Sequence, residues 1–144
     1  MTHFIFSKGV WLGEGVIAFA GSPDTVKFFT RWTIEKEKDG MIACMQEVEL
    51  HGLEQKSENA IHFTLLKEGD FKISLENELM GKVTGKGIWD KKKMAWELRD
   101  QPGMEGYEVY ELQENGEYIF HSEFSSPPFR TIIDGRLWKT DASS

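Results

Sequence analysis

The chain has 144 residues, a length that fits one domain with a core large enough to fold without disulfides or bound metals. Its net charge of −7 and its pI near 5.1 argue against binding to nucleic-acid phosphates or anionic membrane surfaces. The single cysteine, Cys44, excludes an internal disulfide, and no stretch approaches the roughly 18 to 20 apolar residues of a membrane helix. We therefore expect one soluble domain over residues 1–144, cytoplasmic and not exported.

The first expected element is a strand over residues 10–20. The stretch GVWLGEGVIAFAG contains, at residues 13–18, the G-x-G-x-x-A pattern of a dinucleotide loop. That loop requires a helix directly after the glycines, and the following residues, FAGSPD, break a helix within one turn. The sequence therefore favours a β-strand in which glycines mark a bend or a close approach. One face then carries Trp11, Gly13, Gly15, Ile17 and Phe19.

The next two expected strands show the same period of two. In TVKFFTRWTIE, starting at residue 25, one face carries Val26, Phe28, Thr30, Trp32 and Ile34. Lys38-Asp39-Gly40 then predicts a tight turn, because Asp-Gly tolerates positive φ. The strand at 41–50 places Ile42, Cys44, Gln46, Val48 and Leu50 on one side. Cys44 is accordingly interpreted as a small core residue and not as a nucleophile.

The same pattern continues to the end of the chain. Further strands are expected at residues 60–66, 70–76, 81–89, 94–99, 106–113, 117–124 and 129–139. Helix is limited to short turns, one near Leu53–Asn59 and one before Gly9. The basic run at residues 91–93 is interpreted as a solvated hairpin tip and not as a nucleic-acid contact.

These elements predict an all-β fold of about ten strands with short connections. Such a chain leaves exposed sheet edges unless it closes, and closure as a meander pairs the first strand with the last in antiparallel fashion. A single up-and-down antiparallel barrel is therefore the expected architecture. A two-sheet sandwich is the main alternative.

A resemblance to a known superfamily supports the barrel. Gly9-Val10-Trp11, at the start of the first strand, resembles the G-x-W signature of the lipocalin and calycin superfamily of ligand-binding barrels. The resemblance implies that Trp11 closes the barrel floor under a basic side chain of the last strand, for which Arg136 is the candidate. The chain is also similar to intracellular nitrobindin-like barrels, which can hold haem through a histidine near the C-terminus; the last histidine here is His121.

The candidate ligand-binding residues are the side chains expected to face the interior. They are mainly aromatic with a few polar anchors, as in small-molecule sites, although a small barrel can also be filled entirely by its own side chains. The set comprises Phe28, Thr30, Trp32, Gln46, Phe63, Trp89, Trp96, Tyr118, Phe120 and Ser122. Replacement of Trp32 or Trp96 by alanine is expected to weaken ligand binding without unfolding the barrel.

The polar residues suggest no catalytic or metal centre. The four histidines are dispersed without metal-ligand spacing, so neither a metal nor another cofactor is expected. His62 and His121 alternate with apolar neighbours and are expected outside the barrel. The acidic residues Glu97, Glu108, Glu111 and Glu123 are also expected mostly on the solvated exterior, so no acid–base pair is assigned.

The sequence thus indicates a non-enzymatic barrel that binds a small hydrophobic or amphipathic molecule. One alternative is a small barrel enzyme, an isomerase or hydrolase, with a buried carboxylate or histidine beside Gln46 or Tyr118. Another is a protein-interaction module with a solid core and an exposed apolar patch or open sheet edge. Haem binding through His62 or His121 is a variant of the first hypothesis. The oligomeric state stays open.

Overall fold

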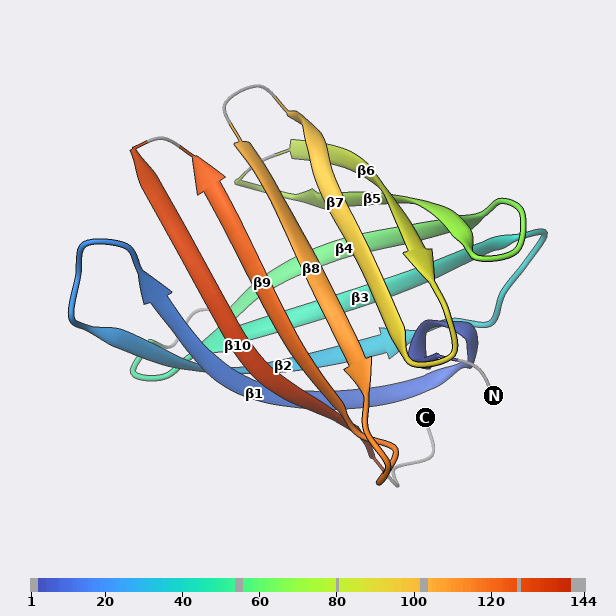
Figure 1. The fold of residues 1–144 in the computed structure, drawn as a ribbon, viewed down its shortest axis with the longest axis horizontal. Helices are drawn as coiled ribbons and strands as arrows, with labels where there is room; N and C mark the ends of the chain where they lie inside the picture. Colours follow the sequence, from blue (N-terminus) through green and yellow to red (C-terminus); the bar gives the residue numbers. More distant parts are fainter. Residues whose placement is uncertain (1–2, 54–55, 80, 102–103, 127, 141–144) are drawn as a thin grey trace.

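The protein is a closed barrel of ten antiparallel strands (Figure 1) in a computed structural model that describes residues 3–53, 56–79, 81–101, 104–126 and 128–140. Each strand pairs with its neighbours in sequence, and the first pairs with the last. This confirms the up-and-down barrel and excludes the two-sheet sandwich. The strands are β1 (Gly9–Phe19), β2 (Thr25–Ile34), β3 (Met41–Leu50), β4 (Lys56–Leu65), β5 (Asp70–Asn77), β6 (Gly81–Trp89), β7 (Lys93–Gln101), β8 (Met104–Leu112), β9 (Tyr118–Ser126) and β10 (Phe129–Lys139).

Alternation along each strand separates the core from the solvent. In β2, Phe28, Thr30 and Trp32 are buried, whereas their neighbours Phe29 and Arg31 are exposed. Successive side chains of a strand point to opposite faces, so a period of two places one set inside the closed sheet. The inward face expected for this segment is confirmed.

The turn between β2 and β3 has the predicted backbone conformation. Asp39 has φ of 54° and Gly40 has φ of 78°. Both values lie in the left-handed region that Asp and Gly tolerate in tight turns. The Asp-Gly pair therefore reverses the chain and fixes the pairing of β2 with β3.

Glycines allow close contact where the barrel closes between β1 and β10. Gly15 lies directly opposite Gly135 in the register of this pair. A Cβ at Gly15 would collide with the backbone carbonyl oxygen of Asp134, and one at Gly135 would collide with that of Glu14. Gly13 and Gly15 therefore serve the packing of a continuous strand, and the dinucleotide-loop interpretation is excluded because no helix follows them.

The two expected helical turns have different outcomes. A 3-10 turn, η1 (Phe4–Phe6), precedes Gly9 as expected. The expected turn near Leu53–Asn59 is wrong for residues 56–59, which begin β4 and pair with β3 as far as the Glu49 and Lys56 partners. Backbone pairing with β3 holds this polar segment in the conformation of a strand, although its sequence lacks apolar alternation. Residues 54–55 lie outside the described part.

One end of the barrel is closed by the N-terminal segment. Phe4 and Ile5 of η1 are almost fully buried and belong to the hydrophobic core. Figure 1 shows η1 at the end of the barrel where β6 turns into β7. In the described part of the chain, no helix is long and apolar enough to cross a membrane.

Candidate functional site

A cavity of about 350 Å³ occupies the end of the barrel away from η1. Its lining comes from nearly every strand, at positions close to the β1–β2, β3–β4, β5–β6 and β9–β10 connections. Most of the lining is apolar, as in typical small-molecule sites. The apolar and aromatic side chains are Ile17, Phe28, Val48, Leu75, Leu98, Tyr110, Phe120, Phe124 and Ile133.

A row of amides forms one polar wall of this cavity. Gln46 Nε2 donates to Thr30 Oγ1 at 3.3 Å, Asn59 Nδ2 donates to Gln46 Oε1 at 3.0 Å, and Asn77 Nδ2 donates to Asn59 Oδ1 at 3.0 Å. Thr30 in turn donates to the backbone oxygen of Glu47 at 2.9 Å. The hydrogen bonds connect β2, β3, β4 and β5, so each amide is held in one orientation toward the interior.

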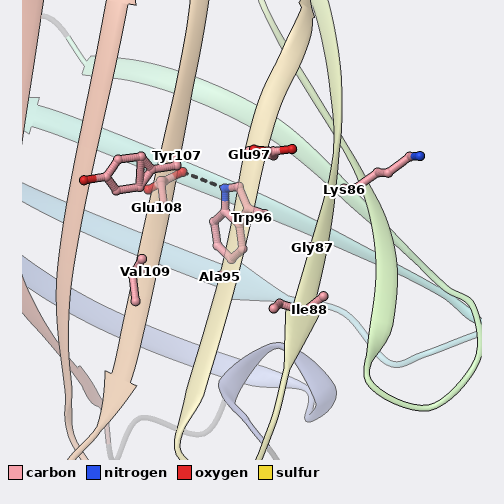
Figure 2. Close-up of a pocket in the computed structure, with 9 residues that line it drawn as sticks. All are labelled: Lys86, Gly87, Ile88, Ala95, Trp96, Glu97, Tyr107, Glu108 and Val109. Atoms are coloured by element: carbon pink, nitrogen blue, oxygen red, sulfur yellow. Dashed lines mark hydrogen bonds between the residues drawn. The ribbon is translucent and has the colours of Figure 1, made fainter.

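A single carboxylate, Glu108 of β8, forms the polar group on the other side of the barrel. Three neutral donors converge on it: Trp96 Nε1 donates to Oε2 at 2.9 Å, and the hydroxyls of Tyr110 and Ser122 donate to Oε1 at 3.1 and 3.0 Å. Figure 2 shows the bond between Trp96 of β7 and Glu108 of β8. These donors fix the carboxyl group between three strands.

The environment of Glu108 opposes its ionisation. Burial raises the pKa of Glu108 above its ordinary value of 4.5, and the hydrogen bonds from Ser122, Trp96 and Tyr110 act in the opposite direction. The residue still contacts the cavity, which it helps to line. In the described lining no lysine, arginine or histidine accompanies it. Glu108 is therefore a desolvated acid without a cationic partner.

The expectation that Glu108 lies outside the barrel is thus wrong. Glu108 shares its face of β8 with Tyr110, which is 1% exposed, whereas Tyr107 and Glu111 of the other face are exposed. Both faces of this strand carry aliphatic or aromatic residues, so alternation alone does not identify the inward one. Assignment of Tyr110 to the core would also have placed Glu108 inside, because the two residues share a face of β8.

The structure divides the ten sequence-predicted site residues between the cavity and the packed half of the barrel. Four line the cavity, namely Phe28, Gln46, Phe120 and Ser122. Thr30 is not part of the lining, but it accepts a hydrogen bond from Gln46, which is. The others pack in the core or at the closed end: Trp32, Phe63, Trp89, Trp96 and Tyr118. Sequence reasoning missed Asn59 and Asn77 of the amide row and Glu108 on the opposite side of the cavity.

The packing of Trp32 and Trp96 in the core changes the expected effect of replacing either residue by alanine. Trp32 is 1% exposed and contacts the rings of Phe4, Trp96 and Tyr110. Truncation of such a residue to alanine costs about 3–5 kcal/mol. The expectation that alanine at Trp32 or Trp96 leaves the fold intact is therefore not supported. Trp32 Nε1 is also the one buried side-chain polar atom without a hydrogen-bond partner in the described part of the chain.

The closed end is held by a different set of contacts from those the calycin resemblance implied. Trp11 packs against Phe4 and Tyr118, and its partner in the register of β10 is Lys139. Arg136 lies on the outer face, stacks on Trp138 at 4.5 Å and pairs with Glu14 and Glu117. The proposed cover of Trp11 by Arg136 is therefore wrong, because alternation along β10 turns Arg136 outward.

His3 is a buried histidine that the sequence did not single out. Its Nδ1 lies 2.8 Å from the Tyr118 hydroxyl, and its Nε2 contacts the backbone oxygen of Asp90. A carbonyl oxygen only accepts, so this contact assigns the proton to Nε2 and leaves Nδ1 to accept from Tyr118. Tyr118 also accepts from the Phe4 backbone N–H at 3.2 Å. The network ties η1 to the β6–β7 turn and to β9.

The two histidines considered for haem binding both lie outside the barrel. His62 is exposed. His121 contacts Asp134 Oδ1 at 2.5 Å and Glu123 Oε2 at 2.8 Å on the outer surface. Glu123 also accepts from Tyr107 and Arg130, and these bonds together with that from His121 lower its pKa to about 2. Neither histidine reaches the cavity, so the structure gives no support to axial haem ligation there.

A second hollow, of about 320 Å³, lies over β6, β7 and β8. Figure 2 shows its lining, in which Lys86 and Glu97 point away from the Trp96–Glu108 pair. Ile88 and Tyr107 supply exposed apolar surface there. The amide row and the other lining residues of the interior cavity do not contribute to it, so the two hollows are separate features that share Glu108.

Comparisons with known proteins support the fold. No protein-family model and no curated protein sequence matches the chain. Among solved structures, the chain is similar to the S-type phycobiliprotein lyase CPES from Guillardia theta, with a TM-score of 0.73 and 9% identity, over 95% of this chain and 90% of that one. It is equally similar to Rv2717c from M. tuberculosis, with a TM-score of 0.73 and 9% identity, over 92% of each chain. These similarities support the closed ten-stranded barrel, the fold that the resemblance to calycins implied.

Proposed function

We propose that the protein binds a small hydrophobic or amphipathic molecule in the interior cavity, without catalysis. The observation that carries the proposal is the 350 Å³ apolar cavity at one end of a barrel whose other end is filled by η1. Burial of apolar ligand surface there contributes about 25 cal/mol per Å² before the costs of association. The amide row and Glu108 supply a few fixed polar groups that orient the bound molecule.

The structural comparisons are consistent with this class of function. One similar structure is named a phycobiliprotein lyase. At 9% identity we extend to this chain only the general idea of a barrel that handles a small molecule, and not that protein's substrate.

The enzyme alternative keeps one supporting feature. Glu108 lines the same cavity as Gln46, which places a desolvated carboxylate where that alternative requires one. A second acid–base or nucleophilic group is the usual complement of such a residue. The described lining contains no histidine, cysteine or lysine, and we therefore favour binding over catalysis. The solid interaction module is disfavoured by the cavity and by the closed sheet.

Native mass spectrometry of protein purified from its own host tests the proposal. The native spectrum is expected to contain a stoichiometric adduct that is absent under denaturing conditions. A neutral fluorescent probe, N-phenyl-1-naphthylamine, provides a second readout that does not depend on ligand charge.

Two neighbouring residues of β10 provide a matched pair of variants. Ile133→Trp narrows the cavity, which Ile133 lines, whereas Ile132→Trp adds the same ring to the other face of the strand. We expect the first variant to lose most of the adduct and probe binding and the second to keep both. Equal binding by the two variants would place the ligand elsewhere and overturn the proposal.

A further inference from the structure

The charge balance of the cavity points to a specific class of ligand, an inference that rests on the proposed function. Glu108 is the single charged residue in the described lining. Its three contacts are all neutral donors, from an indole, a phenol and an aliphatic hydroxyl. Neutral donors stabilise a carboxylate but leave its charge uncompensated, which is costly away from water.

The carboxyl group has capacity for one more donor. A carboxylate offers about four lone-pair positions, and Glu108 uses two on Oε1 and one on Oε2. The amides on the other wall donate to Thr30 and to each other. A donor that enters the cavity can therefore complete the set at Oε2.

The aromatic lining favours a cation in the same cavity. The lining includes Phe28, Tyr110, Phe120 and Phe124, and Tyr110 lies in a near-parallel stack with Phe120 at 5.2 Å between centroids. Aromatic faces attract organic cations, and desolvation strengthens that attraction. An aromatic cavity with one unpaired acid therefore suits an apolar cation better than a neutral molecule or an anion.

We propose that the cavity binds a lipophilic amine in its protonated form, with the ammonium group donating to Glu108 Oε2 and the apolar part packed against the aromatic lining. The ammonium group supplies the missing positive charge, and charge-assisted hydrogen bonds of this kind are about twice as strong as neutral ones. Selectivity among ligands of equal apolar size then comes from this single carboxylate.

Isothermal titration calorimetry with three probes of the same chain length tests the proposal. Decylammonium, 1-decanol and decanoate differ mainly in the charge of the head group. At pH 7 the wild type is expected to bind decylammonium about tenfold or more tightly than decanol, and decanoate most weakly. Glu108→Gln is expected to abolish the preference for the cation. Glu111→Gln, the same charge change on the exposed face of β8, is expected to preserve it.

The wild type alone provides a second measurement in case Glu108→Gln does not fold. Decylammonium affinity is expected to fall as the pH is lowered through the raised pKa of Glu108, while decanol affinity stays constant. Tyr110 is the one titratable group that hydrogen-bonds to Glu108 in the described structure, and its pKa is raised well above 10, so it stays neutral throughout. Lys86 and Glu97 line the second hollow with Glu108 but point away from it.

The outcomes separate this proposal from the proposed function. Equal affinity for the three probes, or a cation preference that survives in Glu108→Gln, overturns the amine proposal and leaves hydrophobic binding intact. Absence of decylammonium binding to the wild type also overturns it. The proposed function is judged independently by the neutral probe and the Ile132 and Ile133 variants.

Discussion

The hydroxyl of Tyr118 lies 2.8 Å from Nδ1 of His3, a residue 115 positions away in the sequence. The same hydroxyl accepts a hydrogen bond from the backbone N–H of Phe4. Burial raises the pKa of Tyr118 to about 12, so the phenol stays protonated and donates a hydrogen bond to His3. One side chain thus anchors the segment that closes the barrel.

Removal of this hydroxyl is expected to loosen the closed end. Tyr118→Phe leaves the buried Phe4 N–H and His3 Nδ1 without their shared partner, which is expected to cost about 1–3 kcal/mol in the free energy of unfolding. Urea denaturation followed by tryptophan fluorescence measures the loss. Tyr107→Phe is the control and should cost less than Tyr118→Phe, because the hydrogen bond that it removes, to Glu123, is exposed to water. Equal effects in the two variants would show that the network does not stabilise the fold.

Two buried tryptophans provide a matched test of the Glu108 contacts. Trp96 Nε1 donates to Glu108, whereas Trp32 Nε1 has no partner among the described residues. The change to phenylalanine removes the same atoms from each, so the lost hydrogen bond should make Trp96→Phe more destabilising than Trp32→Phe by about 1–3 kcal/mol. Urea denaturation at pH 7 gives the difference. A larger cost for Trp32→Phe would contradict the assigned hydrogen bond.

The Gly15–Gly135 contact predicts intolerance of a single methyl group. A Cβ at position 15 would meet the backbone of β10, which cannot move without a change in the barrel register. Gly15→Ala is expected to lower the free energy of unfolding by about 1–3 kcal/mol. Val16→Ala, on the exposed face of the same strand, should stay within about 0.5 kcal/mol of the wild type. Thermal denaturation by circular dichroism compares the two.

His121 is expected to titrate above its ordinary pKa of 6.5. Hydrogen bonds to Asp134 and Glu123 raise its pKa, and slight burial opposes them. A raised pKa in the folded state gives stability that is complete below pH 6.5 and is lost as the pH rises through the folded value. Proton NMR titration of the imidazole should show a lower pKa in Asp134→Asn and an unchanged one in Glu111→Gln. An unchanged pKa in Asp134→Asn would exclude the Asp134 contact in solution.

The architecture was predictable because it depends on a signal repeated in every strand. Alternation in β2 and β3, the Asp39-Gly40 turn and the short connections all indicate hairpins, and ten hairpin-linked strands favour closure. The segment at 56–59 was mistaken because its polar sequence carries no alternation, while its structure is imposed by pairing with β3.

The site was less predictable because its polar groups come together only in the closed barrel. Gln46 was identified from its own strand, but its partners Asn59 and Asn77 lie on β4 and β5, and their contacts depend on register. Glu108 sits on a strand with two apolar faces, so its orientation depends on which face the neighbouring strands cover. Alternation also does not show how far along the barrel axis a residue lies. Phe28 and Trp32 share the inward face of β2, but only Phe28 lines the cavity.

The pairing of β1 with β10 also has a consequence for the order of folding. These strands span residues 9–19 and 129–139, so the first can find its partner only after β2 to β10 have left the ribosome. Until then β1 presents an unpaired edge, which is the usual starting point for association between chains. Contacts so distant in sequence also slow folding. Expression of the chain without β10 is therefore expected to give aggregates, whereas loss of a residue from the cavity lining would leave closure possible.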